Sequence, residues 1–493
     1  MIRTETYAPA HSLALDAAPR SFIERIERTL LEPVDISFLV LFRVALGTLL
    51  AISMERFVAY GWIDELLLDP TFRFKYLGFE WVAPLPRSQM FLLFYALIGL
   101  GLMVAAGLFF RVSAVLLALG ISYIQLIDVS TYLNHYYLAA LLAWLLACTP
   151  ANRAGSVDAW LKRKLRQLRS QPEPEGTGQV ARGVLWLFRF QIGLVYFCAG
   201  LAKLQSDWLL HGQPLRIWLG ASTDLPLLGP LFTWEGVPLL ISWLGFLFDT
   251  TIVAWLSFAR TRPYAYAVVL FFHTLTRLLF DIGMFPWIMS ACALIFFPPD
   301  AARPLFARLG LGFPGPSSGG VPPRNSGRSA RGPLVRVALS VGLLYVAFQA
   351  VMPFRYLAYG GNVLWHEQGM RLSWRVMVRA KGGSVSFLVR RPGEDQMIFV
   401  DPKAYLKPFQ ENEMSGQPDL ILQMAHHIGR EYRAPDGTLP EVYAQANISL
   451  NGRRAAPLID PDVDLMKVQD GLAPASWILP APPEAPPHIR PVL

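Results

Sequence analysis

Apolar stretches of close to 20 residues recur along this chain, and they limit its fold more than any other feature. A stretch of this length is what an α-helix needs to cross about 30 Å of hydrocarbon. Hydrophobic residues make up 53% of the chain and charged residues only 16%, which is typical of an integral membrane protein. We therefore expect a membrane α-helical bundle of about nine transmembrane helices, at approximately 36–56, 90–110, 112–129, 132–149, 184–203, 236–258, 264–281, 284–298 and 334–353.

Basic residues gather in the segments between these stretches and predict how the chain is oriented. Two loops, within 153–182 and 303–336, are rich in arginine and lysine, and such loops lie preferentially on the cytoplasmic side. Four spans separate them, as a shared side requires. Arg20, Arg25 and Arg28 place the N-terminus on the same side. The net charge of +8 is thus explained by orientation, and no nucleic-acid partner is expected.

The same orientation brings three features to the outer face. The fifth span ends there, near Lys203. The turn at 128–135 and everything after residue 353 face the same side. The sequence therefore predicts that chemistry at Lys203 takes place beside a soluble domain.

Composition divides the chain into five parts. They are an N-terminal cytoplasmic or interfacial segment (1–30), a transmembrane domain with the candidate catalytic residues (31–300), a flexible basic linker (301–333), a last transmembrane helix (334–353) and an extracytoplasmic β-rich domain (354–493). Residues 21–31 read as an amphipathic helix on the membrane surface. In the last part we expect strands at 384–390, 396–400 and 442–450, a helix at 420–429, and a hairpin turn at Asn451-Gly452.

Lys203, at the end of the fifth span, is the main candidate for chemistry. An ionisable residue at membrane depth is costly and is a functional candidate by default. Lysine is also rare here, with 8 lysines among 44 basic residues. Arginine keeps its proton in proteins, whereas a desolvated lysine can become a neutral amine. Lys203 is therefore predicted to be a base, although its position also allows its amine to snorkel to the outer interface.

Other polar residues in the predicted spans have both functional and structural interpretations. Asn134 and His135 open the fourth span, where they would bind a ligand or cap a helix. His273 in the seventh span is a ligand contact or a core histidine. Arg189 and Gln191 are candidates for ligand binding, while Asp249 and Arg189 also suit a structural ion pair. No metal motif or phosphate loop is present, so we expect no metal. A base in an apolar cavity suits proton abstraction from a lipophilic acid such as a quinol.

At these residues the chain resembles the vitamin K-dependent γ-glutamyl carboxylases, members of the HTTM membrane family. The resemblance runs from about residue 30 to about residue 480. It is carried by Asn134-His135-Tyr-Tyr-Leu, Ser156-Val-Asp158, Tyr196-Phe-Cys-Ala-Gly-Leu-Ala-Lys203-Leu, Phe272-His273, Ser373-Trp374-Arg-Val-Met377, Asp401-Pro402 and Ile459-Asp460-Pro-Asp-Val-Asp464.

The resemblance implies a carbon–carbon lyase of the peptidyl-glutamate carboxylase type. In that family, oxygenation of reduced vitamin K (the hydroquinone) by O2 to the epoxide drives γ-proton abstraction from a glutamate of a peptide or protein, and CO2 then adds. The family's catalytic lysine falls on Lys203. Its Asn-His pair falls on Asn134 and His135, expected to contact the hydroquinone together with His273. The glutamate-contacting stretch falls on Ser373 and Trp374.

This chain also departs from the family pattern, and the departures leave alternatives open. Arg379, a candidate to bind the substrate glutamate with Ser373 and Trp374, stands where animal members have a histidine, and the extracellular disulfide pair is absent. These differences concern glutamate binding more than quinol chemistry. The alternatives are a vitamin K hydroquinone epoxidase that carboxylates no protein, and a non-enzymatic HTTM protein that binds lipid or exports a peptide. Arginine-rich usage and the missing disulfide predict the inner membrane of a bacterium.

Overall fold

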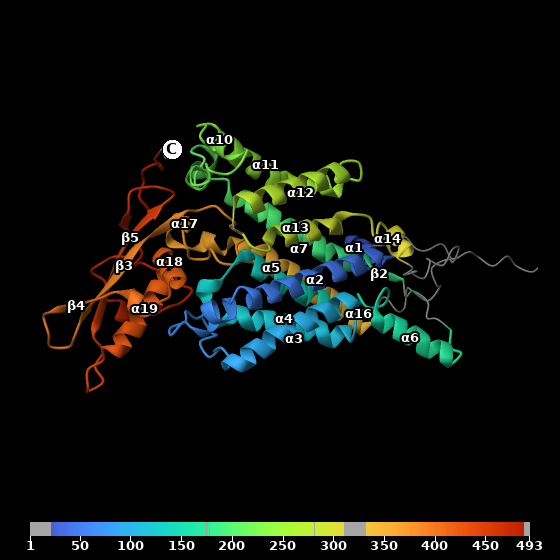
Figure 1. Ribbon diagram of the computed structural model, residues 1–493, viewed down its shortest axis with the longest axis horizontal. Helices are drawn as coiled ribbons and strands as arrows, with labels where there is room; N and C mark the ends of the chain where they lie inside the picture. The colour runs from blue at the N-terminus through green and yellow to red at the C-terminus, as the bar shows by residue number, and fades with distance from the viewer. Residues whose placement is uncertain (1–20, 173–175, 177, 281, 310–331, 488–493) are drawn as a thin grey trace, which may run out of the picture.

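The computed structural model describes residues 21–172, 176, 178–280, 282–309 and 332–487. Residues 1–20 of the predicted N-terminal segment, and residues 310–331 of the predicted linker, lie outside the described residues. The described chain forms a helical bundle with a mixed domain of helices and strands at one end (Figure 1).

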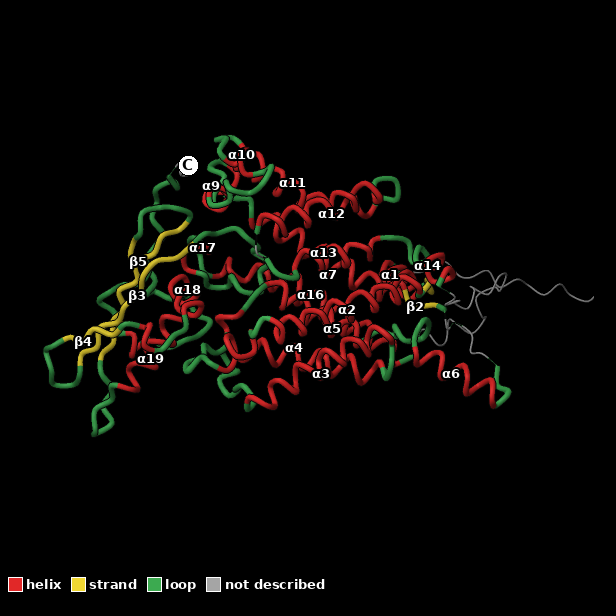
Figure 2. The backbone as a smooth tube through the Cα atoms, in the orientation of Figure 1, coloured by secondary structure: helices red, strands yellow, loops and turns green. Residues whose placement is uncertain are grey.

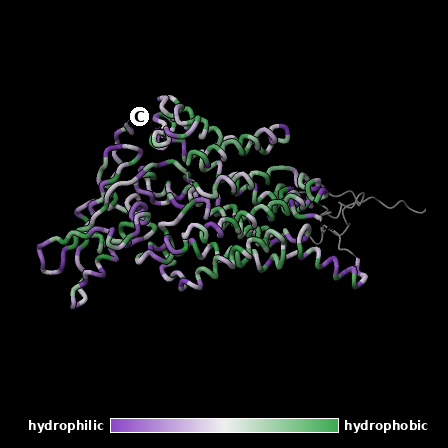
Figure 3. Tube along the Cα trace, in the orientation of Figure 1, coloured by the Kyte–Doolittle hydropathy of each residue, from purple (hydrophilic) through white to green (hydrophobic). Residues whose placement is uncertain are grey.

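Six helices are long and apolar enough to cross a membrane. They are α2 (Ser37–Ala59), α3 (Arg87–Ala106), α4 (Phe110–Ile127), α7 (Arg182–Ala202), α11 (Val237–Ser257) and α16 (Pro333–Val351) with its 3₁₀ extension η4 (Met352–Ala358). Hydrophobic residues run along the bundle, and hydrophilic ones gather at its ends (Figure 3). Gly47 and Gly101 let α2 and α3 approach closely, since a Cβ at Gly47 would lie 2.6 Å from the backbone nitrogen of Ala105.

The predicted number of nine spans is not confirmed. Three predicted spans correspond to α5 (Asn134–Ala147), α12 (Arg262–Leu279) and α13 (Phe285–Ala293) with η3 (Leu294–Phe296). Helices α5 and α13 are too short to cross a membrane by themselves, since a span needs about 20 residues. Helix α12 is long enough but more polar, since it contains Arg262, His273 and Arg277.

The described parts of the predicted basic loops and the amphipathic N-terminal helix lie at one end of the bundle (Figure 1). Helix α1 (Phe22–Leu31) leaves Phe22 and Ile23 exposed, as an amphipathic helix would. At the same end lie α6 (Val157–Leu168), α14 (Arg303–Arg308) and the two-stranded sheet of β1 (Pro33–Asp35) and β2 (Gln179–Ala181). Three short helices connect α7 to α11 near the other end: α8 (Ser206–Leu209), α9 (Leu215–Gly220) and α10 (Gly229–Phe232).

The C-terminal domain at the opposite end contains a four-stranded antiparallel sheet in the order β4-β3-β5-β6 (Figure 2). Its elements are α17 (Val363–His366), β3 (Lys381–Arg390), β4 (Met397–Val400), α18 (Pro408–Gly416), α19 (Pro418–Glu431), β5 (Glu441–Leu450) and β6 (Ala456–Pro457). The predicted strands, helix and hairpin turn are confirmed. Alternate residues of β5, from Val442 to Ile448, are buried in a core shared with α19, as the period-2 pattern of a half-buried strand requires.

Polar contacts hold this domain against the bundle. Arg453 binds Asp207 of α8 through both carboxylate oxygens, at 2.6 and 2.7 Å, and Asn451 donates to the same carboxylate at 2.8 Å. Burial opposes ionisation of Asp207, but these hydrogen bonds outweigh it and hold its pKa below the usual value. The turn after β5 is therefore fixed directly beside the end of α7.

Candidate functional site

Lys203 follows the last residue of α7, and its side chain turns into the bundle. Its Nζ donates to Asp249 Oδ2 at 2.7 Å and to the carbonyl of Ala199 at 3.2 Å, and lies 5.2 Å from the centre of the Trp208 ring. Only 7% of the lysine side chain and 8% of the aspartate side chain are exposed. The snorkelling interpretation is thus wrong: the amine is paired inside the protein.

The ion pair considered between Asp249 and Arg189 is also wrong. Asp249 pairs with Lys203, whereas Arg189 donates to the carbonyls of Ile295 at 2.8 Å and Phe297 at 3.0 Å. These carbonyls lie where η3 ends, and a helix end leaves carbonyls without intrahelical partners. Arg189 therefore donates hydrogen bonds to carbonyls at the end of a neighbouring helix, which lack intrahelical partners.

His273 of α12 meets Tyr196 of α7. The Nε2 atom of His273 lies 2.9 Å from the tyrosine hydroxyl, and both side chains are buried. Phe248 packs against both rings. The histidine thus has a partner in the core, yet it also faces the space that Lys203 faces.

Lys203, Asp249, Tyr196 and His273 line one cavity. Most of its remaining wall is aromatic or aliphatic and includes Trp208, Leu215, Trp218, Ile241, Phe272, Phe280, Ile282, Phe285 and Met289. Apolar walls with a few convergent polar groups are typical of small-molecule sites. This combination fits a lipophilic ring with ionisable hydroxyl groups.

The cavity volume is about 100 Å³. For comparison, an apolar cavity of about 150 Å³ holds one benzene. A bicyclic quinol therefore requires some lining side chains to move.

A segment of the C-terminal part, Leu372 to Met377, forms part of the cavity wall, and we call it the closing segment. Val376 and Met377, just after the Ser373-Trp374 motif, are among the lining residues. Leu372, Trp374 and Met377 have φ values of 63°, 60° and 53°, a left-handed conformation that is uncommon for bulky residues. Such strain persists where the surrounding structure imposes it and is frequent at ligand-binding sites.

Asn134 and His135 lie beside the cavity rather than on its wall. His135 and His273 each lie 6.3 Å, between ring centroids, from Phe285, which lines the cavity. Asn134 Oδ1 accepts from the Tyr132 hydroxyl at 3.0 Å, and that hydroxyl accepts from the backbone of Leu372 at 2.9 Å. The N-cap of α5 is Leu133, without a side-chain capping hydrogen bond, and Asn134 connects α5 through Tyr132 to the closing segment.

Gln191 lies in the first half of α7, away from Lys203, and does not line the cavity. Its Oε1 accepts from the Tyr345 hydroxyl of α16 at 2.5 Å, while its buried Nε2 has no protein partner. The structure therefore brings Lys203 and His273 together and leaves Arg189 and Gln191 apart from them.

Trp374 and Ser373 contact the chain itself. The Trp374 ring stacks on Tyr137 of α5 at 4.8 Å between centroids, and its buried Nε1 has no protein partner. The Ser373 hydroxyl donates to the carbonyl of Met370.

Arg379 belongs to a buried charge cluster in the C-terminal domain. Its Nε lies 3.2 Å from Oε1 of Glu367, and Lys381 Nζ lies 3.3 Å from the same oxygen. Burial lowers the pKa of Lys381 to about 8, with Glu367 opposing the shift and Arg379 adding to it. Burial likewise raises the pKa of Glu413 in the same cluster, against the attraction of Arg379. Arg379 is thus already engaged with a carboxylate of the protein.

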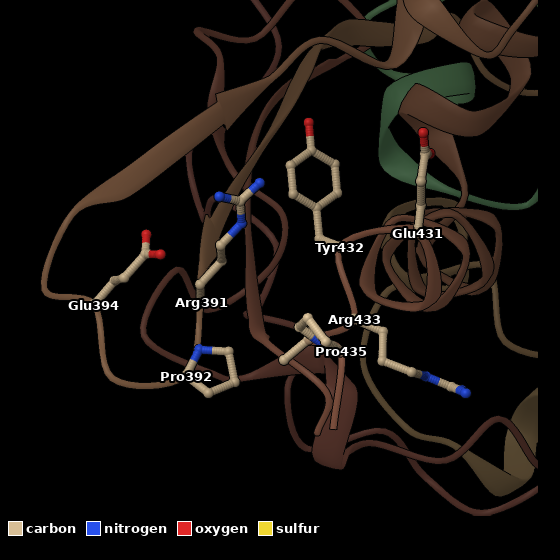
Figure 4. Close-up of a pocket in the computed structure, with 8 residues that line it drawn as sticks. Arg391, Pro392, Glu394, Glu431, Tyr432, Arg433 and Pro435 are labelled. Atoms are coloured by element: carbon tan, nitrogen blue, oxygen red, sulfur yellow. The ribbon is translucent and has the colours of Figure 1, made fainter. Parts of the chain in front are cut away.

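A second hollow, of about 620 Å³, opens on the C-terminal domain (Figure 4). Arg391 and Arg433 line it together with Glu394 and Glu431, so its charges balance. None of the sequence-predicted site residues lines it. The cavity at Lys203 is therefore the better candidate for chemistry.

Fold and cavity together define a class: an integral membrane protein that holds paired ionisable side chains in an aromatic cavity under a water-facing domain. Comparison of the sequence with known protein families identifies the family. Residues 31–301 match the HTTM domain, and residues 335–484 match the lumenal domain of the vitamin K-dependent gamma-carboxylases. The chain belongs to the vitamin K-dependent gamma-carboxylase family. No solved structure matches it. Among the described residues, no cluster of histidine, cysteine or acidic side chains is arranged to hold a metal.

Sequence reasoning missed three contributors to the cavity. The sequence favours a structural ion pair for Asp249, although an acid within an apolar helix is also a signal of function. Tyr196 lies within the motif that ends at Lys203, and no pattern in the sequence marks its side chain as part of the cavity. Met377 was not expected near Lys203, because 174 residues separate the two positions (377 − 203).

Proposed function

We propose that this protein is a vitamin K-dependent γ-glutamyl carboxylase, a lyase that couples vitamin K hydroquinone epoxidation to carboxylation of peptidyl glutamate. The carrying observation is the buried Lys203–Asp249 pair on the wall of an aromatic cavity. Membership of the family supports the substrate class, and the cavity supports the site.

The residues present fit the hydroquinone. Aromatic side chains such as Trp218 and Phe280 would hold its ring, and the end of α7 would present Lys203 to a hydroxyl group. Reduced vitamin K supplies acidic hydroxyl groups and, with O2, the driving force for carboxylation. Tyr196 and His273 would hydrogen-bond the opposite part of the ring. His135 and Asn134 would hold Phe285 and the closing segment in place.

On the glutamate side, the closing segment is the proposed meeting point. Ser373 and Trp374 lie a few positions before the cavity-lining residues Val376 and Met377, and Trp374 belongs to the hydrophobic core of the bundle. A glutamate bound there would reach the cavity mouth while the aromatic wall excludes water, which would otherwise compete with CO2. Arg379 would contribute only if it exchanged Glu367 for the substrate carboxylate.

We further propose the full topology expected from the loops. Helices α5, α12 and α13 complete nine spans. Helices α5 and α13 pack largely within the bundle, whereas α12 directs Tyr264, Phe271 and Leu278 outward, as a lipid-facing helix would. The N-terminus faces the cytoplasm of a bacterium, and the domain at 354–493 faces outward from the inner membrane. The basic segment 301–333 links the helical part at 31–300 to the last span at 334–353.

The test is a product analysis on purified protein with reduced vitamin K, O2, labelled CO2 and a glutamyl peptide. Epoxide together with label in the peptide supports the carboxylase. Epoxide without label would indicate the epoxidase, which the engagement of Arg379 with Glu367 favours. Absence of epoxide contradicts both and leaves the non-enzymatic lipid-binding or export protein.

A further inference from the structure

The surroundings of Lys203 are those of an ammonium group. An ammonium has three N–H donors and no lone pair, whereas a neutral amine has a lone pair that needs a donor. Nζ is surrounded by a carboxylate oxygen at 2.7 Å, a carbonyl oxygen at 3.2 Å and the Trp208 ring at 5.2 Å. All three attract positive charge, and none donates a hydrogen bond to a lone pair.

An ammonium cannot accept a proton, so Lys203 must first transfer its own proton to an acceptor. The other ionisable groups that line the cavity are Tyr196 and His273, which bond to each other rather than to Lys203. Asp249 Oδ2 is the acceptor already in hydrogen-bond contact with Nζ.

We propose that Asp249 is the final proton acceptor of the site and acts through Lys203, so that the base is the pair rather than the lysine alone. This inference rests on the proposed function and deepens it. One N–H bond of Lys203 breaks as the O–H bond forms on Asp249. The amine then takes the proton of a hydroxyl group in the cavity. At the end Lys203 is again an ammonium, Asp249 is a neutral acid, and the ligand carries the negative charge.

The arrangement keeps the cavity neutral overall at every stage. Before transfer, the charges of Lys203 and Asp249 cancel, and afterwards the ammonium faces the anion of the ligand. An uncompensated charge in such an apolar space would be far more costly. Asp249 is therefore a positioning and proton-holding residue, and Lys203 remains the catalytic residue.

The experiment is infrared difference spectroscopy on the purified full chain with 4-chloro-1-naphthol. This probe is a bicyclic phenol, neutral in water at neutral pH, whose anion absorbs at longer wavelength. In the wild-type protein we expect the bound probe to become the anion while a carboxylic acid C=O band appears. Asp249→Asn should lose that band. Asp207→Asn is the matched control: its carboxylate is also buried, but its partner is an arginine, so the band should remain.

Lys203→Ala provides an independent check. Without its partner, Asp249 in the apolar cavity should already be neutral, so the acid band should appear before the probe is added. Three results would overturn the proposal: an anionic probe with no acid band, a bound probe that stays neutral in the wild type, or an acid band that survives Asp249→Asn. None of these depends on turnover, so failure of the epoxide assay remains a separate result about the proposed function.

Discussion

Lys203 and Asp249 form their pair from two helices, α7 and α11, at positions 46 residues apart. The sequence predicted an ionisable lysine at the end of α7, because burial of an amine is costly anywhere in a membrane. It did not predict the partner, because that depends on how α11 is rotated against α7. Gly200 allows the close approach, since a Cβ there would lie 2.6 Å from the methyl of Thr250.

Lys203→Arg is expected to reduce epoxide formation at least about a hundredfold, the scale of general acid–base catalysis. A guanidinium keeps the charge and the contact with Asp249 but cannot release its proton. The assay is epoxide formation from reduced vitamin K by purified protein. Arg189→Lys, a basic exchange away from the cavity, should retain activity, and retained activity in Lys203→Arg would contradict the base role.

A second residue-scale prediction concerns Lys381, whose pKa is lowered by burial from 10.5 to about 8. Between these values the unfolded chain binds more protons than the folded one, so the contribution of Lys381 to the free energy of unfolding rises with pH. Below about pH 8 Lys381 is charged in the folded protein, so burial of this charge lowers the free energy of unfolding by its full amount. Thermal melts of wild type and Lys381→Met should therefore diverge in favour of the wild type from about pH 8 upward. A pH-independent difference would contradict this account.

At the scale of elements, the segment from Leu372 to Met377 connects the water-facing domain to the cavity. Its motif marked it as a site, and its three left-handed residues explain its path. The sequence does not predict which side chains of this segment face the cavity, because the segment is neither helix nor strand and has no periodic pattern. Strands and long helices were predictable for the opposite reason: their burial repeats every two or every 3.6 residues.

Met377→Trp should block the cavity from this segment. A larger side chain at the cavity wall occupies the space that a bicyclic ligand needs. We expect 4-chloro-1-naphthol to bind at least about tenfold more weakly, a cost of about 1.4 kcal/mol. Equilibrium dialysis measures this. Leu472→Trp, at an exposed site of the same domain, should bind normally, and unchanged binding by Met377→Trp would show that the ligand enters elsewhere.

At the scale of the whole molecule, the two ends of the bundle carry different elements. One end carries the basic helix α6 and the amphipathic helix α1, and the other carries the sheet (Figure 1). The cavity is lined by Lys203 at the end of α7 and by Val376 and Met377 of the C-terminal part. Loop charges predicted this division. The exact number of spans was less predictable, because helices packed inside a bundle need not be long and apolar over their whole length.

The proposed orientation predicts that a cysteine placed at Asp436 reacts with a membrane-impermeant reagent in intact cells. Asp436 is exposed in the water-facing domain. Cys148, the exposed native cysteine at the far end of α5, should react only after permeabilisation and serves as the internal control. The reverse pattern would invert the topology.

The central claim is that the cavity at Lys203 drives carboxylation of glutamate. The most direct measurement is a mass spectrum of a glutamyl peptide after incubation with purified protein, reduced vitamin K, O2 and ¹³CO2, alongside quantification of epoxide. The account predicts labelled γ-carboxyglutamate and epoxide together, both lost in Lys203→Ala. A wild-type protein that makes no epoxide, or a Lys203→Ala variant that still carboxylates, would contradict it.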